Sequence, residues 1–264
     1  MKISIVTPSY NQGRFIKQCI ESVKRQEGDF LIEHIICDNC STDETEEILR
    51  AYHADPGRVE AKIIVEKDGG QTEAINKGFR LATGDIVCWL NTDEWYYDGA
   101  LQRVVNFFMN HPDVDVAFGD CDFVDEKLRV VKRKREHFFS KSMLLYYGCF
   151  IPSCATFVRR RVLDQGFFLN DYYKVCMDYE WYVRLSQNGF KFKHMGTVLA
   201  AFVLHGKNIS KVYPLDYRKN DFNNVRLQWG CAKFLPGQLR IFLFEILSLF
   251  WIGIRVTSRL LRNK

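Results

Sequence analysis

Short apolar runs alternate with amphipathic patterns through the first half of the chain. The apolar runs predict strands at residues 3–6, 34–37, 62–65, 85–90 and 114–118. Between them, apolar side chains recur every three or four positions, which is typical of helices that bury one face. These helices are expected at residues 15–23, 72–81 and 101–108, and a further helix with Ile48, Leu49 and Tyr52 on one face is expected to open with a capping box at Ser41-Thr-Asp-Glu44. Such alternation predicts an α/β fold with a mostly parallel sheet and helices on both of its faces.

The pattern is less regular after residue 118. It predicts a basic strand pair around residues 128–135, a helix near 143–147, strands at 155–158 and 198–204, and a helix from Met177. We expect one domain over residues 1–235 because no internal repeat or clear linker divides it.

Residues 236–264 differ from this domain in their pattern of apolar and charged residues. Residues 241–254 are almost wholly apolar and are flanked by basic residues at Arg240, Arg255, Arg259, Arg262 and Lys264. A helix that spans a bilayer needs about 20 apolar residues, and this run is shorter and contains Glu245. We expect an amphipathic helical tail over 237–264 that lies on a membrane surface. The alternative is a helix that packs on the domain or on a second subunit, and a homo-oligomer is therefore a candidate assembly.

The composition narrows the class of partner. A net charge of +5 on 264 residues is modest, and the basic run at 127–135 lacks interleaved aromatic residues, so we expect no nucleic-acid partner. Nine cysteines lie among apolar neighbours, which favours buried free thiols in a reducing cytoplasm.

Acidic residues follow the expected strands, at the sheet edge where α/β folds bind ligands. The turn Asn91-Thr-Asp93-Glu94 could hold a hard cation such as Mn²⁺ or Mg²⁺ through Asp93, which would neutralise a leaving diphosphate. A solvated turn explains the same tetrapeptide. Asp38 could accept a hydrogen bond from a nucleobase or ribose, or it could be a helix N-terminal acid.

Three further residues are candidates in the second half. Asp178 and Glu180 open a helix beside Trp181, an arrangement that suits a general base next to a sugar-stacking wall. Alternatively, they are N-terminal helix acids with a core-facing tryptophan. His205 ends an apolar strand and could complete a metal site with Asp93, although a lone strand-end histidine is more often a hydrogen-bonded surface residue.

The order of several short motifs resembles family 2 glycosyltransferases of the GT-A fold, over residues 1 to about 210. The motifs are Thr7-Pro-Ser-Tyr-Asn11, Cys37-Asp-Asn-Cys-Ser-Thr-Asp43, Glu66-Lys-Asp-Gly-Gly-Gln71, Ala74-Ile-Asn-Lys-Gly78, Ala82-Thr-Gly-Asp85, Leu90-Asn-Thr-Asp-Glu94 and Met177-Asp-Tyr-Glu180. The chain departs from the family at Cys40, where glycine is usual, at Glu94, and at Trp181-Tyr182.

The resemblance implies a role for each matching residue. Residues 1–118 would form the half that binds a nucleotide-diphosphate sugar, and residues 119–235 the acceptor half. Asp93 and His205, with Ser210 downstream, would approach the metal and the diphosphate. Asp178 would be the catalytic base. Glu180 and Trp181 would face the acceptor. The donor would be bound by Pro8, Tyr10, Asp38, Asp68, Asn76, Lys77 and Asn91.

The expected activity is therefore an inverting, metal-dependent transfer of a sugar to an acceptor hydroxyl in cell-surface polysaccharide or lipopolysaccharide synthesis. The tail favours a cytoplasmic enzyme that is peripheral on the inner face of the cell membrane, with a lipid-linked saccharide as a candidate acceptor. Two alternatives stay open: a nucleotidyltransferase acting on a sugar phosphate, and a catalytically degenerate, membrane-associated sugar-binding protein.

Overall fold

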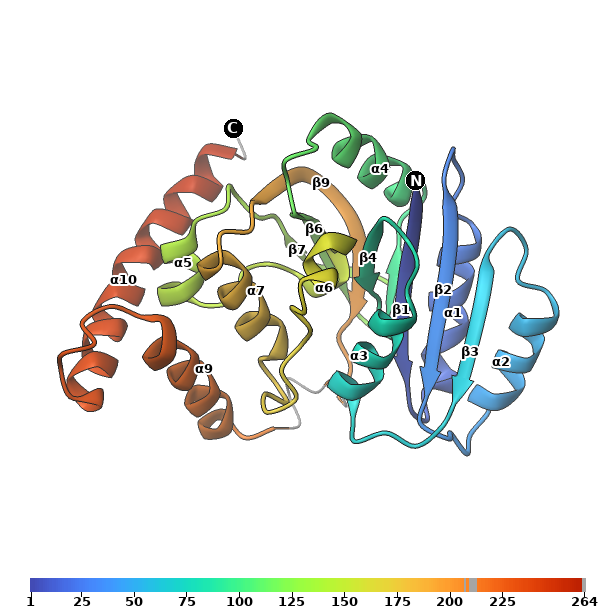
Figure 1. The fold of residues 1–264 in the computed structure, drawn as a ribbon, viewed down its shortest axis with the longest axis horizontal. Coiled ribbons are helices and arrows are strands. Elements are labelled where there is room, and N and C mark those ends of the chain that lie inside the picture. The colour runs from blue at the N-terminus through green and yellow to red at the C-terminus, as the bar shows by residue number, and fades with distance from the viewer. Residues whose placement is uncertain (207, 209–212, 263–264) are drawn as a thin grey trace.

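The computed structural model describes residues 1–206, 208 and 213–262, which form one sheet with helices on both faces (Figure 1). Its first four long strands are parallel and adjacent, in the order β3 (Glu60–Val65), β2 (Leu31–Asp38), β1 (Lys2–Ser9) and β4 (Ile86–Trp89). They are connected by α1 (Gly13–Lys24), α2 (Thr45–Ala54) and α3 (Gln71–Leu81). The predicted α/β fold is confirmed.

Beyond β4 the sheet becomes mixed. β8 (Thr156–Arg159) is antiparallel to β4 and to β6 (Val116–Val124), and β6 is parallel to β9 (Phe192–Val203). β5 (Glu94–Tyr96) is antiparallel to β9, and β7 (Val130–Lys134) is antiparallel to β6. The boundary expected between residues 118 and 119 falls within β6, so the two halves share a strand of one continuous sheet.

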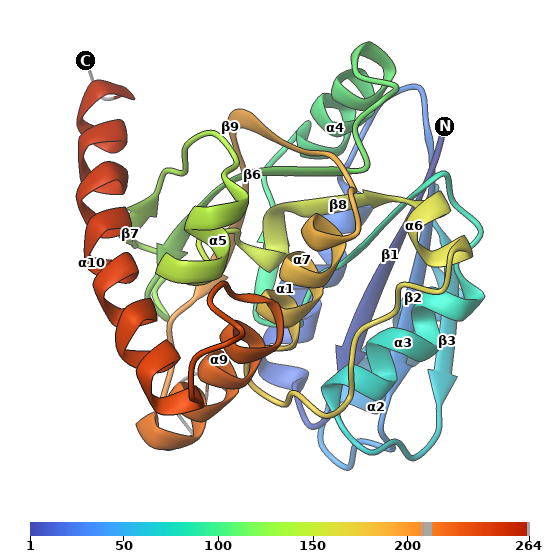
Figure 2. The same ribbon diagram turned by 60° about the vertical axis from the view of Figure 1, so that its left-hand side comes forward.

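The remaining helices lie mainly around the second half of the sheet (Figures 1 and 2). They are α4 (Ala100–Asn110), α5 (Lys141–Tyr147), the short 3₁₀ helix η1 (Ser153–Ala155), α6 (Arg160–Asp164), α7 (Met177–Gln187), α9 (Leu215–Trp229) and α10 (Gly237–Arg262). In both views α9 and α10 lie together at the end of the molecule opposite β3.

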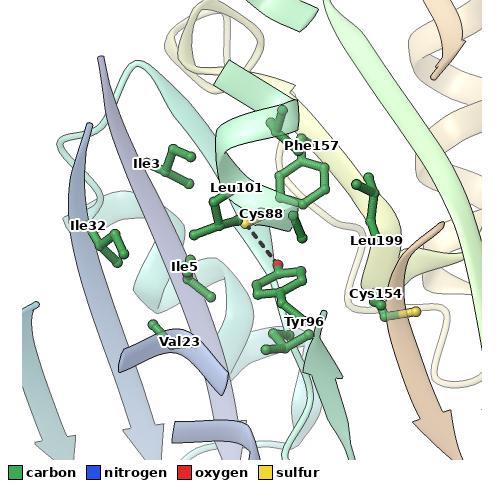
Figure 3. Close-up of a cluster of buried hydrophobic side chains, with 14 of the residues drawn as sticks. Ile3, Ile5, Val23, Ile32, Cys88, Tyr96, Leu101, Cys154, Phe157 and Leu199 are labelled. Atoms are coloured by element: carbon green, nitrogen blue, oxygen red, sulfur yellow. Dashed lines mark hydrogen bonds between the residues drawn. The ribbon is translucent and has the colours of Figure 1, made fainter. Parts of the chain in front are cut away.

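Apolar side chains bury both faces of the central strands. On one face, Ile3 and Ile5 of β1 pack with Val23 of α1 and Leu101 of α4 (Figure 3). On the other face, Trp89 of β4 lies 5.7 Å from Trp181 of α7, between ring centroids. Because β1 and β4 are held from both sides, the loops at their carboxyl ends start from fixed positions.

The expected tail helix is present as α10, and one of its faces packs on the domain. Phe244 is fully buried, with its ring centroid 5.6 Å from that of Tyr146 in α5. Arg255 is also buried and forms an ion pair at 2.7 Å with Glu136. None of the helices in the described chain combines the length and apolar character needed to cross a bilayer.

Candidate active site

A cleft of about 430 Å³ opens where β1 and β4 end. Its walls come from segments far apart in the sequence, as expected for an α/β fold that binds its ligand beyond the strand ends. The polar residues that line it are Ser9, Tyr10, Gln12, Asn39, Asp68, Gln71, Asn91, Thr92, Asp93, Glu94, Ser153, Lys174, Asp178, His205 and Asn208.

The cleft brings Asp93 and His205 together, as the sequence suggested. The imidazole Nε2 lies 3.0 Å from Asp93 Oδ2, and the Asn208 amide donates to the same oxygen at 3.0 Å. The imidazole also stacks on the ring of Phe15, with the centroids 4.7 Å apart, which fixes its orientation. Ser210, the other residue expected near the metal, lies outside the described residues.

The donor atoms at this pair suit a divalent cation. A carboxylate oxygen and an imidazole nitrogen are ligands that Mn²⁺ accepts, and Asp93 Oδ1 has no hydrogen-bond partner among the described residues. Across residues 1–206, 208 and 213–262, no group of three or more His, Cys, Asp or Glu side chains is placed to hold a metal ion. A cation here would therefore take its other ligands from a bound phosphate and from water.

Glu94 shapes the turn that presents Asp93. Its side chain is buried, and its carboxyl accepts the backbone N–H of Asn91 at 2.7 Å. Burial, and then the negative charge of Asp93, raises the pKa of Glu94 well above its usual value. The Asn91 side chain in turn accepts a hydrogen bond at 2.6 Å from Gln71. The acidic turn is thus a hydrogen-bonded structure in which Glu94 is buried and Asp93 is paired with His205.

Asp178 also lines the cleft and lies half-buried in the first turn of α7. Its Oδ1 accepts the backbone N–H of Tyr179 at 2.7 Å, and its Oδ2 accepts a weak hydrogen bond from the Cys149 thiol at 3.7 Å. Burial raises the pKa of Asp178. A carboxylate with few strong donors and a raised pKa is suited to accept a proton.

Pro8, Tyr10, Asp68 and Asn91, which we expect to bind the donor, all line the cleft. Asp38 lies at the end of β2, next to Asn39 in the cleft wall, and is almost fully buried. It accepts hydrogen bonds from the backbone and hydroxyl of Ser41 at 2.8 and 2.6 Å.

The loop after Asp38 differs in detail from the sequence prediction. The capping box expected from Ser41 to Glu44 is wrong: α2 begins at Thr45, and the Ser41 hydroxyl is bound to Asp38 instead. Cys40 has a φ of 54°, in the left-handed region that favours glycine. The loop therefore has a backbone conformation that suits the glycine usual at this position in the family it resembles. The cysteine side chain raises the free energy of that conformation.

Two residues expected to bind the donor, Asn76 and Lys77, do not line the cleft. The Asn76 amide is buried and holds the backbone of Leu169, with bonds of 2.9 and 3.0 Å. Lys77 forms an ion pair at 2.6 Å with Glu66. Both are therefore structural in this conformation rather than part of the cleft wall.

The acceptor-side assignment of Glu180 and Trp181 is wrong. Glu180 is 1% exposed and forms an ion pair at 2.7 Å with Arg184, one turn later in α7. The Trp181 ring is fully buried against Trp89, and its indole N–H donates to the backbone oxygen of Phe167 at 2.8 Å. Helix geometry explains the first error, since side chains two positions apart point to opposite sides.

Sequence reasoning missed four polar residues of the cleft, Gln12, Ser153, Lys174 and Asn208. Lys174 is an exposed cation on a wall that otherwise carries acids, which suits an anionic ligand. Asn208 follows His205 by three positions, and this closeness in sequence to a candidate metal ligand was the one feature that could have marked it as a site residue. Ser153 begins the three-residue helix η1 and Lys174 lies in an irregular segment, so no periodicity marks either residue.

Comparison with known proteins places this geometry in a family. The family described as Glycosyl transferase family 2 matches residues 4–167. A chondroitin synthase from Escherichia coli is 28% identical over 230 residues, which cover 84% of this chain and 32% of that protein. The chain thus spans about a third of the length of this relative.

Solved structures share the fold. The complex of S. aureus TarS residues 1–349 with UDP-GlcNAc has a TM-score of 0.69 at 18% identity, covering 94% of this chain and 72% of that one. The mannosyltransferase PcManGT from Pyrobaculum calidifontis, in complex with GDP-Man and Mn²⁺, has a TM-score of 0.58 at 18% identity, covering 86% and 61%.

Proposed function

Since the chain belongs to glycosyl transferase family 2, we propose that it transfers a sugar from a nucleotide-diphosphate sugar to an acceptor hydroxyl, with inversion at the anomeric carbon. The observation that carries the proposal is that a single cleft contains both the pair of Asp93 and His205 and the carboxylate of Asp178. An inverting transfer needs a group that stabilises the leaving diphosphate and a base for the acceptor, and these residues suit the two tasks.

On the donor side, Tyr10 and Asp68 line the space proposed for the nucleoside, and Asp38 lies next to Asn39 of the cleft wall. Tyr10 is 53% exposed and offers a ring face to a nucleobase, and the buried carboxylate of Asp38 suits an N–H or ribose hydroxyl. Solved structures with this fold carry UDP-GlcNAc or GDP-Man, which supports a nucleotide sugar as the donor class.

Asp93 and His205 would hold Mn²⁺ or Mg²⁺ beside the donor diphosphate. The bound cation supplies Lewis-acid stabilisation of the negative charge on the departing diphosphate. Asn208 orients Asp93 through its hydrogen bond to Oδ2, and Phe15 orients His205. Lys174 adds a positive charge to the same cleft.

Asp178 would take the proton from the acceptor hydroxyl while that oxygen attacks the anomeric carbon. The nucleotide diphosphate leaves from the opposite face of the sugar, so one displacement inverts the configuration. The raised pKa of Asp178 makes the carboxylate a better proton acceptor than an ordinary aspartate.

The acceptor is proposed to be a saccharide in cell-surface polysaccharide synthesis, carried on a lipid. The similarity to a chondroitin synthase supports a saccharide acceptor. The outward face of α10 supports a membrane location. Five large apolar side chains on this face are each exposed over 41% or more of their surface: Phe242, Ile246, Leu249, Phe250 and Val256. Glu245 is an exposed charged residue of the same helix. Such a face, next to the basic end of the chain, suits the surface of an anionic bilayer.

Release of nucleotide diphosphate tests the proposed chemistry. The purified protein is incubated with Mn²⁺ and, separately, UDP- and GDP-sugars, with membranes of the host as the acceptor source. Acceptor-dependent release of UDP or GDP is the expected result. Formation of UTP or GTP and a sugar 1-phosphate when pyrophosphate is added to the incubation would indicate a nucleotidyltransferase. Binding of a nucleotide sugar without turnover would indicate a degenerate sugar-binding protein.

A further inference from the structure

A second hollow lies along the outward side of α9, between the segment that precedes α7 and the start of α10. Its walls include Tyr172, Tyr217, Asn220, Asp221, Asn224 and Ile241. We refer to these residues as the α9 groove. We propose that the α9 groove binds the inner sugars of the acceptor, the part of the saccharide chain behind the hydroxyl that receives the new residue. This inference rests on the proposed function.

The side chains in the groove have the chemistry of a saccharide site. Tyr172 is 65% exposed and Tyr217 is 38% exposed, so both present ring surface on which the C–H face of a pyranose can pack. Each asparagine amide offers two N–H donors and a carbonyl acceptor, which match neighbouring sugar hydroxyls. Ligand sites commonly combine aromatic walls with a few such polar groups.

The asparagines are unfavourable for the helix that carries them. Asn220, Asn223 and Asn224 lie in the interior of α9, where asparagine is among the weaker helix formers. In the described structure, no hydrogen bond from these side chains caps the helix or ties it to the domain. A ligand-binding role gives a reason for three such residues within five positions.

Asp221 adds a second, independent observation. Its side chain is 94% buried, and its Oδ2 has no hydrogen-bond partner among the described residues. Leaving a buried acceptor without a partner costs about 1–3 kcal/mol. Burial raises the pKa of this carboxyl, although the thiol of Cys176 acts against the shift. A sugar hydroxyl entering the groove would supply the donor that Asp221 lacks.

The groove is connected to the catalytic cleft by a short segment. Tyr172 borders the groove, while Lys174 and Val175 border the cleft. Cys176 contacts Asp221 and is the N-cap residue of α7, two positions before Asp178. A saccharide chain that occupies the groove and crosses this segment would therefore have its terminal hydroxyl directed toward Asp178.

Binding of tetrasaccharides to the full chain tests the inference independently of transfer. The probes are chito-, malto- and chondroitin-derived tetrasaccharides, measured by saturation-transfer-difference NMR and by titration calorimetry. Tyr217→Ala should weaken binding of the preferred tetrasaccharide at least 10-fold, and Asn224→Ala should weaken it to a smaller extent. Gln228→Ala, an exposed position later in α9, is the matched control and should bind as the native protein does.

The outcomes separate this inference from the proposed function. Nucleotide-sugar binding should be unchanged in Tyr217→Ala, and circular dichroism should show an intact fold. Tetrasaccharide binding at the groove without any transfer by the native protein would contradict the proposed enzyme activity and leave the groove supported. The inference is overturned if none of the three tetrasaccharides binds, or if Tyr217→Ala binds them as tightly as the native protein.

Discussion

The carboxylate of Asp93 and the imidazole of His205 meet at 3.0 Å although 112 positions separate them in the chain. The pairing joins the turn after β4 to the end of β9, the long strand that crosses the second half of the sheet. It therefore forms only when the two halves of the sheet are assembled. This dependence on the whole fold makes the pair a natural point at which to test the metal site.

Removal of the cation is expected to abolish transfer. Activity should disappear with EDTA and return when Mn²⁺ or Mg²⁺ is added, because the leaving diphosphate would otherwise carry its charge unshielded. Asp93→Ala and His205→Ala should each lower kcat/KM at least about 100-fold at saturating metal, since removal of even supporting groups costs 10- to 100-fold. Full activity of Asp93→Ala in the presence of chelator would rule the site out.

The outward face of α10 should determine binding to lipid. The double variant Phe242→Asp, Leu249→Asp should lose co-flotation with vesicles that contain anionic phospholipid, because both side chains are more than 60% exposed and apolar. Donor binding should be kept. Thr257→Asp adds charge at an exposed polar position of the same helix and serves as the control. If the native protein dimerises and does not float, this face is a subunit interface instead.

The ion pair between Arg255 and Glu136 should anchor α10 to the domain. Both side chains are at most 8% exposed, and the Arg255 guanidinium lies 4.5 Å from the centre of the Tyr147 ring. Arg255→Ala should lower the free energy of unfolding by about 3–5 kcal/mol, because it removes the positive charge that pairs with a buried carboxylate. Arg14→Ala breaks the exposed pair with Glu126 and should cost about 0–1 kcal/mol. Equal effects in chemical denaturation would contradict the anchoring role.

The buried face of α10 also changes how the tail should be studied. Deletion of residues 237–264 would remove Phe244 and Arg255 and expose the surface of α5 that they cover. Loss of membrane binding in such a truncation could then reflect a damaged domain. Substitutions on the outward face avoid this ambiguity.

Glu33 should make stability depend on pH in the acid range. Burial raises the pKa of this carboxyl, but hydrogen bonds from Lys62, Ser4 and Thr83 outweigh it and lower the pKa to about 2. Since the folded-state pKa is below that of the unfolded chain, the stabilisation is present above about pH 4.5 and is lost as the pH falls toward 2. Urea denaturation from pH 6 to pH 2.5 should show this loss. The slope should be shallower in Glu33→Gln, and an unchanged slope would contradict the assignment.

The strand ends of the site could be predicted from the sequence, because apolar runs followed by polar turns mark where a parallel sheet binds its ligand. Asp93 was singled out in this way and Asp178 from its place at the start of a helix, whereas Tyr10 and Asp68 came from the resemblance to a family, and all four line the cleft. What the sequence does not report is the direction of a side chain. Asn76 lies in a matching motif, yet its amide turns toward Leu169.

The pattern of apolar and polar residues could not predict two elements of the second half of the chain. β5 has only three residues, too few to show alternation. Helix α9 buries few side chains, Asp221 and Val225 among them, so its apolar periodicity is weak. In the proposed α9 groove, the polar residues that obscure the helical pattern would be the ones that bind the ligand.

The most direct test of the proposed mechanism is the turnover of Asp178→Asn, measured with the nucleotide sugar that supports product release. Asparagine keeps the size of the side chain but cannot accept the acceptor's proton. We expect kcat to fall by about 10² to 10⁴, or roughly 3 to 5 kcal/mol of barrier, with donor affinity unchanged by calorimetry. Glu180→Gln, on the same helix but paired with Arg184, is the control and should retain kcat in the folded protein. Near-native turnover of Asp178→Asn would contradict the assignment of the base.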